Sequence, residues 1–428
     1  MAQGYEWRVS LESPTGLILD TGELNDPATG RLGNLTVDLD DSRVKIRSVS
    51  FQGGRNRELD TIPPGTMTIV LDNREGIWNP EDVFGPYYGL LYPGKGIQLA
   101  YVNKVPGLYL DFAVGVFYGQ ITSWSFEYDL NGDAIAIVSA KDLLGRLAGI
   151  DIPSTAVPQE KTGARVARIL ALAGLNASQW SVQEGYSTLA ADTISGDALG
   201  LIEDVAFQEQ GYFVSARNVI VFVQRNSFQE NPELYFTNIT NSVNAPAGVY
   251  TMPFSSFGVA YSDDSVANSV TTVSALGTAV VTDAFKVETY GKTSKSYDVN
   301  YSSFLEQTAF TNFLVTNFGA PQFRPDSMTI SHDGVLELPD INALQDVNGY
   351  TALLLASIVK YGVPVVVEFA PGGSGKQLLK TVVVSSWSHT STPSRYDVNI
   401  GFEPATFIGV FRLDNGDYGI LDTNLLAF

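Results

Sequence analysis

Apolar and polar residues alternate with a period of two along most of the first third of the chain. The alternation is clearest in residues 5–11, 35–39, 44–51 and 117–128. A period of two is typical of strands with one buried face. The pattern therefore predicts a β-rich N-terminal unit, built as an antiparallel barrel or sandwich.

A hairpin is predicted around Asn131-Gly132, which separates the run 117–128 from the run 134–140. Asn-Gly between two apolar runs is the strongest short signal for a β-hairpin. The run 134–140 is apolar enough that we expect burial on both faces. A short helical turn at 142–148 then closes the first β domain, residues 1–148.

The pattern changes after residue 148. Residues 149–160 contain Pro153 and Pro158 and are predicted to be a linker. Helical spacing follows in 163–175 and again after Ser195-Gly196-Asp197, up to Gly211. Two short strands, 212–214 and 219–223, complete a small α+β module at 149–239.

Strand-like patterning returns from residue 240. Runs at 267–273, 363–369, 378–389 and 395–402 predict strands, and the last two are expected to pair. Residues 283–290 lead into Gly291. Helical patterns at 304–318 and 350–359 predict insertions into a second β domain, 240–408. Residues 409–428 are interpreted as a C-terminal arm. The predicted fold class is thus mainly β with a small α+β module, containing two antiparallel β-barrel or β-sandwich domains.

Composition narrows the possible functions. Of 428 residues, 44% are hydrophobic and only 17% are charged, below the roughly 25% of typical soluble proteins. A surface rich in uncharged polar residues suits extensive subunit contacts. The net charge of −20 and the lack of a basic run argue against nucleic-acid binding, which needs Lys and Arg at phosphates.

No cofactor or metal is expected. The chain has no cysteine, which excludes disulfides and thiolate chemistry, and it has two histidines, His332 and His389. The N-terminal residues show no signal-peptide pattern, and no apolar run is long enough to span a membrane.

Three motifs resemble a phosphate-binding, a calcium-binding and a hydrolase site, but none has the residues that its class requires. Residues 372–377 resemble a phosphate loop, but Ala370 and Gln377 stand where Gly and Ser/Thr are required, so a hairpin turn is predicted. Residues 129–133 have the wrong spacing for a calcium loop. His389 could serve a Ser-His-Asp hydrolase, but the chain contains no Gly-x-Ser-x-Gly elbow. His389 is therefore interpreted as a packed or rim histidine. We therefore expect no enzyme activity.

The most specific stretch is residues 67–82. A strand ends in Asp72-Asn73-Arg74-Glu75-Gly76, a composition that predicts a tight reversal with Gly76 at positive φ. Aromatic residues follow among Gly and Pro, and they are interpreted as subunit contacts, with core packing or sugar binding as alternatives. The candidate interface residues are Asp72, Asn73, Arg74, Glu75, Gly76, Trp78, Asn79, Pro80, Tyr87, Tyr88 and Tyr92, with Tyr109 nearby.

Four features in order resemble minor tail proteins of long-tailed bacteriophages that infect actinobacteria, and more distantly the hub proteins of contractile baseplates. They are the turn at 72–76 with Asn79-Pro80; residues 116–124 followed by 140–147; residues 266–270 with Tyr290-Gly291; and residues 387–393 followed by 416–421 and Phe428. Each motif alone has low specificity, and their order is more specific. Such turns usually carry Asp where Glu75 stands, a difference expected to be neutral.

The resemblance implies a structural subunit of the tail tip in the virion, made in the host cytoplasm. Three copies would form a ring, and two related β domains per copy would present six similar faces to the sixfold tail tube. Implied partners are the distal tail or tail tube protein, the C-terminus of the tape measure protein and other minor tail proteins. DNA would pass through the lumen without specific binding. Alternatives are a hexameric distal tail protein and a receptor- or glycan-binding tail protein.

Overall fold

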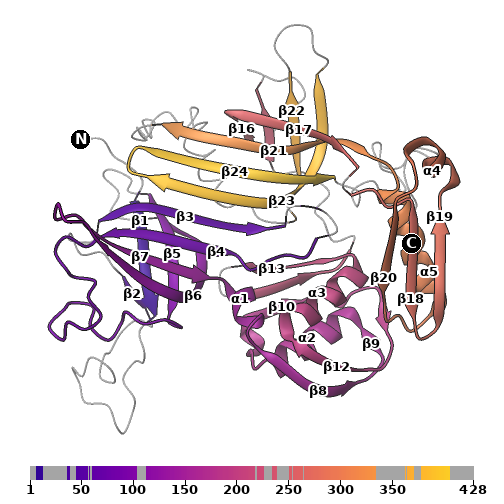
Figure 1. Cartoon of the computed structure of the whole chain (residues 1–428), viewed down its shortest axis with the longest axis horizontal. Coiled ribbons are helices and arrows are strands. Elements are labelled where there is room, and N and C mark those ends of the chain that lie inside the picture. The colour runs from indigo at the N-terminus through magenta and orange to yellow at the C-terminus, as the bar shows by residue number, and fades with distance from the viewer. Residues whose placement is uncertain are drawn as a thin grey trace.

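The structure, a computed structural model, is drawn in Figure 1. It describes residues 6–12, 36–38, 45–55, 57, 60–103, 112–216, 219–225, 234–238, 250–252, 254–263, 265–333, 362, 364–370 and 377–404. Strands dominate it, so the predicted mainly β class with a small α+β module is confirmed. Among these residues, no helix combines the length and the apolar character that crossing a bilayer requires.

Fourteen strands from both predicted β domains join in one sheet. The N-terminal strands are β1 (Glu6–Glu12), β2 (Thr36–Asp38), β3 (Ile46–Gly54), β4 (Thr66–Asp72), β5 (Gly96–Asn103), β6 (Phe112–Tyr128) and β7 (Ala134–Lys141). The C-terminal strands are β15 (Leu234–Thr237), β16 (Tyr250–Met252), β17 (Ser256–Ser262), β21 (Gln322–Asp333), β22 (Pro364–Phe369), β23 (Leu378–Thr392) and β24 (Arg395–Pro404).

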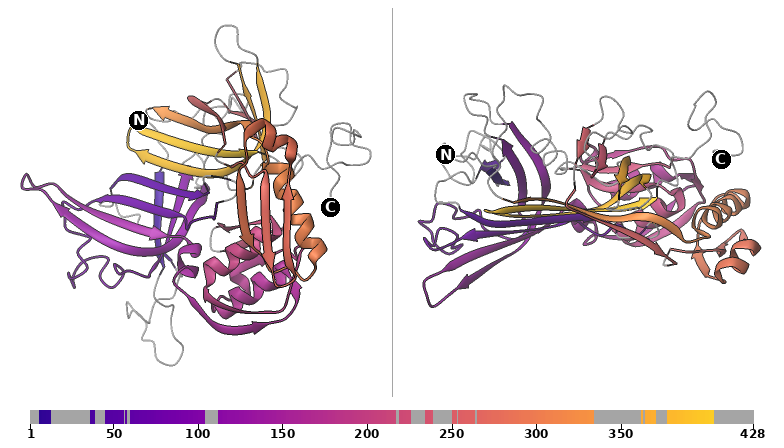
Figure 2. Two further views of the ribbon diagram at one scale, coloured as in Figure 1. Left: turned by 45° about the vertical axis from the view of Figure 1, so that its right-hand side comes forward. Right: turned by 90° about the horizontal axis from the view of Figure 1, so that it is seen from above.

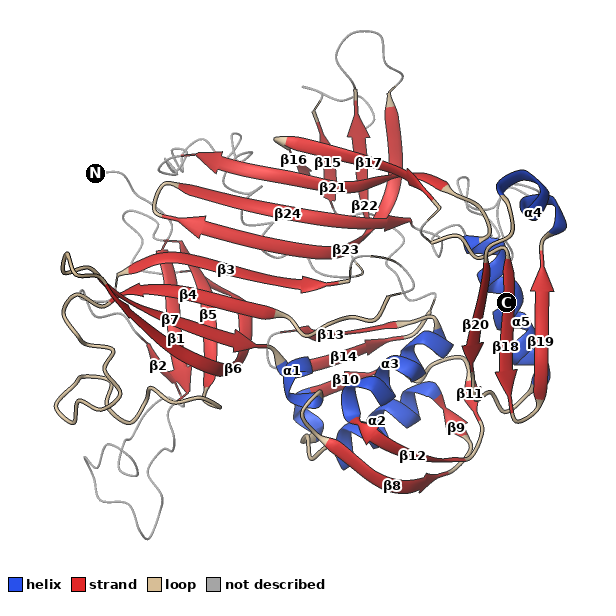
Figure 3. Ribbon diagram, in the orientation of Figure 1, coloured by secondary structure: helices blue, strands red, loops and turns tan. Residues whose placement is uncertain are grey.

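The two groups of strands meet where β23 pairs antiparallel with β3, from Ser386 opposite Gly54 to Ser391 opposite Val49. Figure 3 shows β24, β23, β3 and β4 side by side at this seam. The Arg55 guanidinium bonds the buried Glu403 carboxylate at 2.9–3.1 Å across it. The predicted pairing of residues 378–389 with 395–402 is confirmed by β23 and β24, and β22 pairs with β23 as expected.

The sheet buries one of its faces across the seven strands from β21 to β6. Following the strand register across the seam gives one row of side chains that are all buried: Ile330, Val398, His389, Phe51, Met67, Ala140 and Ile121. This row belongs to two apolar cores, one under each group of strands, and Trp7 packs against both. Burial therefore continues from one predicted β domain into the other.

The α+β module has α1 (Leu143–Leu147), β8 (Asp151–Val157), β9 (Glu160–Lys161), α2 (Thr162–Leu172), a 3₁₀ turn (Ala177–Gln179), β10 (Trp180–Val182), β11 (Thr188–Leu189), β12 (Asp192–Asp197), α3 (Ala198–Glu209), β13 (Tyr212–Ala216) and β14 (Val219–Val223). The Asp142 and Asp197 carboxylates cap α1 and α3 at the expected starts. The predicted linker at 149–160 is wrong, because β8 pairs with β12 there. Pro153 is tolerated because β8 is an edge strand.

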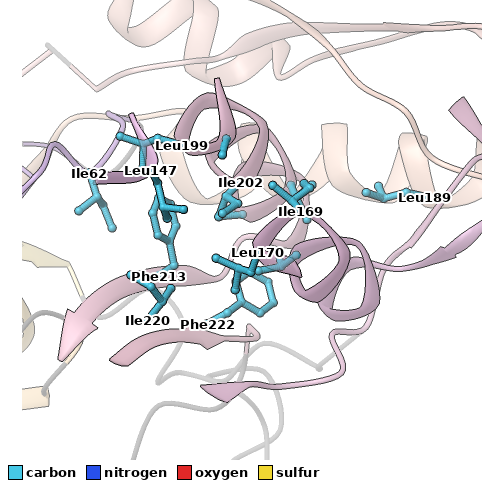
Figure 4. Packing of buried hydrophobic residues seen from close by; sticks show 14 of the residues in the cluster. Ile62, Leu147, Ile169, Leu170, Leu189, Leu199, Ile202, Phe213, Ile220 and Phe222 are labelled. Atoms are coloured by element: carbon cyan, nitrogen blue, oxygen red, sulfur yellow. The ribbon is translucent and has the colours of Figure 1, made fainter. Parts of the chain in front are cut away.

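A third unit, here called the lobe, consists of β18 (Ser269–Ser274), β19 (Gly277–Thr282), α4 (Ala284–Tyr290), β20 (Ser294–Asp298) and α5 (Phe304–Phe318). The helix predicted at 304–318 matches α5. The lobe and the α+β module share one apolar core, part of which Figure 4 shows. The division into 1–148, 149–239, 240–408 and 409–428 stays a prediction.

Other expectations meet different outcomes. The run 134–140 is not buried on both faces: in β7, buried residues alternate with half-buried ones because the sheet has one open face. The 117–128 run is part of a single 17-residue strand, β6. The predicted helix at 350–359, the phosphate-loop-like residues 371–376, Tyr109 and the C-terminal arm lie outside the described residues.

Candidate functional site

The candidate site begins in the connection between β4 and β5, residues 73–95, called here the β4–β5 loop. Figure 3 shows it as a long tan connection at one end of the molecule. Asp72, the last residue of β4, lies inside it and accepts hydrogen bonds from the Arg74 backbone N–H (3.1 Å) and Nε (2.9 Å). The Arg47 guanidinium lies 3.5 Å away and also pairs with Asp133. These bonds hold the pKa of Asp72 well below its usual range, so the carboxylate stays charged.

Trp78 anchors the first part of the loop to the end of β4. Its indole N–H donates to the Asp72 carbonyl oxygen at 3.0 Å, and its backbone N–H donates to Asn73 Oδ1 at 3.2 Å. The Trp78 ring stacks on Tyr87 with 4.8 Å between centroids and lies 6.1 Å from Trp124. The side chain is 0% exposed. Trp78 and Tyr87 belong to the same apolar core as the N-terminal strands, so the loop is packed onto that core.

A series of turns gives the loop its outer shape. Gly76 has φ +69, as predicted, and its N–H donates to the Asn73 carbonyl oxygen at 2.9 Å. The Asn79 side chain accepts the Glu81 N–H at 3.0 Å. At the far end, Lys95 is buried with its ammonium 4.9 Å from the centre of the Tyr92 ring. Burial lowers the pKa of Lys95, and nearby Glu12 partly opposes this.

The structure separates the candidate interface residues into two groups. The side chains of Asp72, Asn73, Trp78 and Tyr87 are buried and shape the loop from inside. The other candidates are exposed: Arg74, Glu75, Gly76, Asn79, Pro80, Tyr88 and Tyr92. Whether the exposed group meets a partner stays a prediction.

Sequence reasoning missed the most exposed apolar side chain of the loop, Phe84, which is 94% exposed. Val83 beside it is also exposed. The available signal was two adjacent apolar residues between Asp82 and Gly85-Pro86, a setting in which nothing predicts a core. The tip of the β6–β7 hairpin adds exposed Tyr128 and Leu130 at the same end, because the Asn73 N–H donates to the Ala134 carbonyl oxygen at 2.8 Å.

The open face of the large sheet is a second candidate surface. One row of side chains on it crosses seven strands and is uncharged except for one lysine: Thr329, Asn399, Ser388, Gln52, Thr66, Lys141 and Gln120. In the neighbouring row, Asp397 is paired with Arg395 at 2.7 Å. A hollow of about 530 Å³ lies at the seam, and its lining includes Gly54 and Gly401, which have no side chains to fill it.

Two chemical alternatives can be compared with the structure, a catalytic His389 and a metal site. His389 is 1% exposed, stacks on Phe51 at 4.3 Å and bonds the Tyr396 hydroxyl through Nδ1 at 2.8 Å. The interpretation as a packed histidine is confirmed. Among the described residues, no three or more His, Asp or Glu side chains gather as metal ligands.

The comparisons with known proteins identify the fold. No family model and no curated protein match the chain. It is similar to the solved structure of a tail protein from Neisseria meningitidis MC58, with TM-score 0.55 and 10% identity over 94% of this chain and 98% of the other. It is equally similar to the 43 kDa tail protein of prophage MuSo2 from Shewanella oneidensis, with TM-score 0.55 and 10% identity over 94% and 99%. The chain thus shares its fold with these two tail proteins over nearly its whole length.

Proposed function

We propose that the protein is a non-enzymatic structural subunit of a bacteriophage tail tip, of the siphovirus type that infects actinobacteria. Three copies form a ring that closes the distal end of the tail tube and adapts its sixfold symmetry to the threefold tip. The ring contacts the distal tail or tail tube protein above it and receives the C-terminus of the tape measure protein and other minor tail proteins.

The continuous sheet is the observation that carries this proposal. Because β23 pairs with β3 and one buried row crosses the seam, the two groups of strands are held in a fixed relation. A single subunit then contributes two β units side by side to a ring, and three subunits contribute six. The shared fold with two phage tail proteins supports the same role.

The open face of the sheet suits the wall of a channel. It carries mainly hydroxyl and amide side chains and offers a polyanion few cationic partners: Lys141 stands alone in its row, and Arg395 is paired with Asp397. Binding to DNA gains its strength from Lys and Arg at the phosphates. DNA is therefore expected to slide past this face without sticking.

Counting subunits tests the proposal. Native mass spectrometry of the purified protein, and averaged electron microscopy of intact tails, should give three copies in a ring. Six copies would favour the hexameric distal tail protein. A monomer at all concentrations that is also missing from tails would refute a tail-ring role of either kind.

The variant Gly76→Val should impair ring formation more than folding. A left-handed backbone costs a non-glycine residue roughly 1–2 kcal/mol, and no atom lies within 4 Å of the added Cβ, so the strain is confined to the backbone. Relief of that strain would displace the exposed Arg74, Glu75 and Asn79. Urea unfolding should report a small loss of stability while native mass spectrometry reports loss of the ring.

Gly76→Asn is the matched control, because asparagine tolerates the left-handed region. It should keep both stability and the ring. Normal rings with valine at this position would show that the β4–β5 loop lies away from the subunit contacts.

A further inference from the structure

Strand β19 (Gly277–Thr282) leaves one edge of the lobe sheet open. Among the described residues it pairs only with β18, over six residue pairs without a break in register. Figure 3 shows β19 along the outer margin of the lobe, and the right-hand view in Figure 2 places the lobe at the end of the molecule away from the N-terminal strands. In the part of the chain that the structure describes, the outer edge of β19 therefore has no neighbouring strand.

Hydrogen bonds of β18 show which backbone groups of β19 point outward. The Ser269 N–H donates to the Thr293 carbonyl oxygen at 3.2 Å, on the side of β20. On the same side, the Val273 carbonyl oxygen accepts the Val299 N–H at 2.9 Å. Hydrogen-bonded and non-hydrogen-bonded pairs alternate between antiparallel strands, so Ser269, Thr271 and Val273 form non-hydrogen-bonded pairs with β19. Their partners in β19 direct the N–H and C=O groups away from β18: Thr282, Val280 and Thr278.

Nothing in β19 hinders a further strand from pairing with it. Open edges in folded proteins usually carry charged residues, prolines or bulges, which prevent unwanted pairing. β19 reads Gly-Thr-Ala-Val-Val-Thr and contains none of these. Val280 at its centre is 62% exposed. The edge is thus of the kind to which an extended peptide segment adds as a new strand.

A second copy of the chain offers no equally open edge apart from its own β19. Of the other strands of five or more residues that end a sheet within the described ranges, β17 and β12 have a break in register, and β8 contains Pro153. β20 carries Lys295 and Asp298, and no residue of β13 is exposed. Pairing of β19 with itself would need a two-fold axis between copies, which a ring of three does not contain. A strand from a different protein therefore fits the edge best.

The surroundings of β19 define the side chains that suit such a strand. Helix α5 lies along one face of the lobe strands, as the left-hand view in Figure 2 shows. A Cβ added to Gly277 would lie 3.6 Å from the Phe304 ring at the start of α5, and that side chain is 45% exposed. Asp283, which follows β19, is paired with Lys286 at 3.5 Å. The edge therefore favours an uncharged segment with an apolar side chain on the face of α5.

We propose that β19 binds an extended segment of a different tail protein, which pairs along the open edge as a fourth strand of the lobe sheet. The segment is uncharged over about five residues, the length that three outward-pointing positions span along a strand. It places an apolar side chain against Phe304. The inference rests on the proposed function and adds the place where the subunit holds a protein of another kind.

Amide hydrogen exchange, read by mass spectrometry with single-residue fragmentation, tests the proposal on the full-length protein. The purified protein is compared with the same protein in intact tails. The outward amides of Thr278, Val280 and Thr282 should exchange about tenfold or more slowly in tails, because the added strand supplies their hydrogen-bond partners. The inward amides of Ala279 and Val281 already bond to β18, so their exchange should stay unchanged and serves as the internal control.

A proline variant removes the contact from one side. Val280→Pro deletes one outward N–H and leaves the bonds to β18 in place, since an outward position on an edge strand tolerates proline. The variant should fold and form rings as the wild type does, but Thr278 and Thr282 should lose their protection in tails. Val280→Thr keeps the N–H and the branched side chain, so it should keep the protection.

Unchanged exchange at the outward amides in tails that contain the protein would overturn this contact and leave the proposed function standing. Protection that Val280→Pro fails to remove would also overturn it. Protection in the purified protein that grows with its concentration would mean that copies pair with each other, which would overturn the choice of a different protein. Absence of the protein from tails would refute the proposed function itself.

Discussion

Replacing Trp78 with alanine is expected to lower the free energy of unfolding by about 3–5 kcal/mol, the range for deleting a large buried aromatic side chain. The side chain is fully buried, stacks on Tyr87 and donates its indole N–H to the Asp72 carbonyl oxygen. Its loss would open a cavity where the β4–β5 loop packs on the core of the N-terminal strands. The exposed face of the loop would lose its shape together with this packing.

Urea unfolding followed by circular dichroism measures the change. Phe84→Ala is the matched control in the same loop, because Phe84 is almost fully exposed and should change stability by no more than about 0.5 kcal/mol. If Trp78→Ala unfolds at the wild-type urea concentration, packing of Trp78 on the core does not stabilise the protein. If both variants prevent ring formation while only Trp78→Ala lowers stability, the loop acts through its shape as well as its surface.

Acid is expected to destabilise the protein through His389. Burial lowers the pKa of this imidazole from 6.5 to about 3, so the folded protein keeps it neutral while the unfolded chain protonates it. Between pH 6.5 and about 3 the unfolded state therefore binds more protons, and stability falls as the pH falls. One titrating group changes the free energy of unfolding by about 1.4 kcal/mol per pH unit in this window.

The measurement compares the pH dependence of urea unfolding in the wild type and in His389→Gln. Glutamine cannot gain a proton in this range, and it can still hydrogen bond to the Tyr396 hydroxyl. The variant is expected to be less stable at pH 7 but to lose less stability between pH 6.5 and 4. Parallel curves for the two proteins would show that His389 does not titrate on unfolding. Because His389 lies in the buried row at the seam, the wild type should lose the seam early in acid.

Several elements could be predicted from the sequence because their signals are local. The helix at 304–318 follows from its apolar spacing. The starts of α1 and α3 follow from the capping residues Asp142 and Asp197. The turn at Gly76 follows from a composition that needs positive φ. Each of these signals depends on neighbours a few residues away, so the same local structure forms in most tertiary surroundings.

The predictions that were wrong concern features that depend on contacts with residues far away in the sequence. Pro153 marked a linker, but pairing with β12 makes the segment a strand. The apolar run 134–140 suggested burial on both faces, but only one face of β7 is buried. Among the candidate interface residues, composition could not separate buried Tyr87 from exposed Tyr88, because the difference depends on stacking with Trp78.

By itself, the sequence determined the β-rich class, the small helical module and the rigid reversal after β4, since alternation, capping and turn chemistry act over a few residues. The tertiary structure alone decided that strands from the two ends of the chain form one sheet with one open polar face. It also decided which aromatic side chains of the β4–β5 loop face outward, and that β19 keeps an open edge at the opposite end of the molecule. The physical reason is that strand pairing and burial depend on contacts between residues hundreds of positions apart, such as Trp7 Nε1 with Ser391 Oγ at 2.9 Å, and no local pattern encodes those partners.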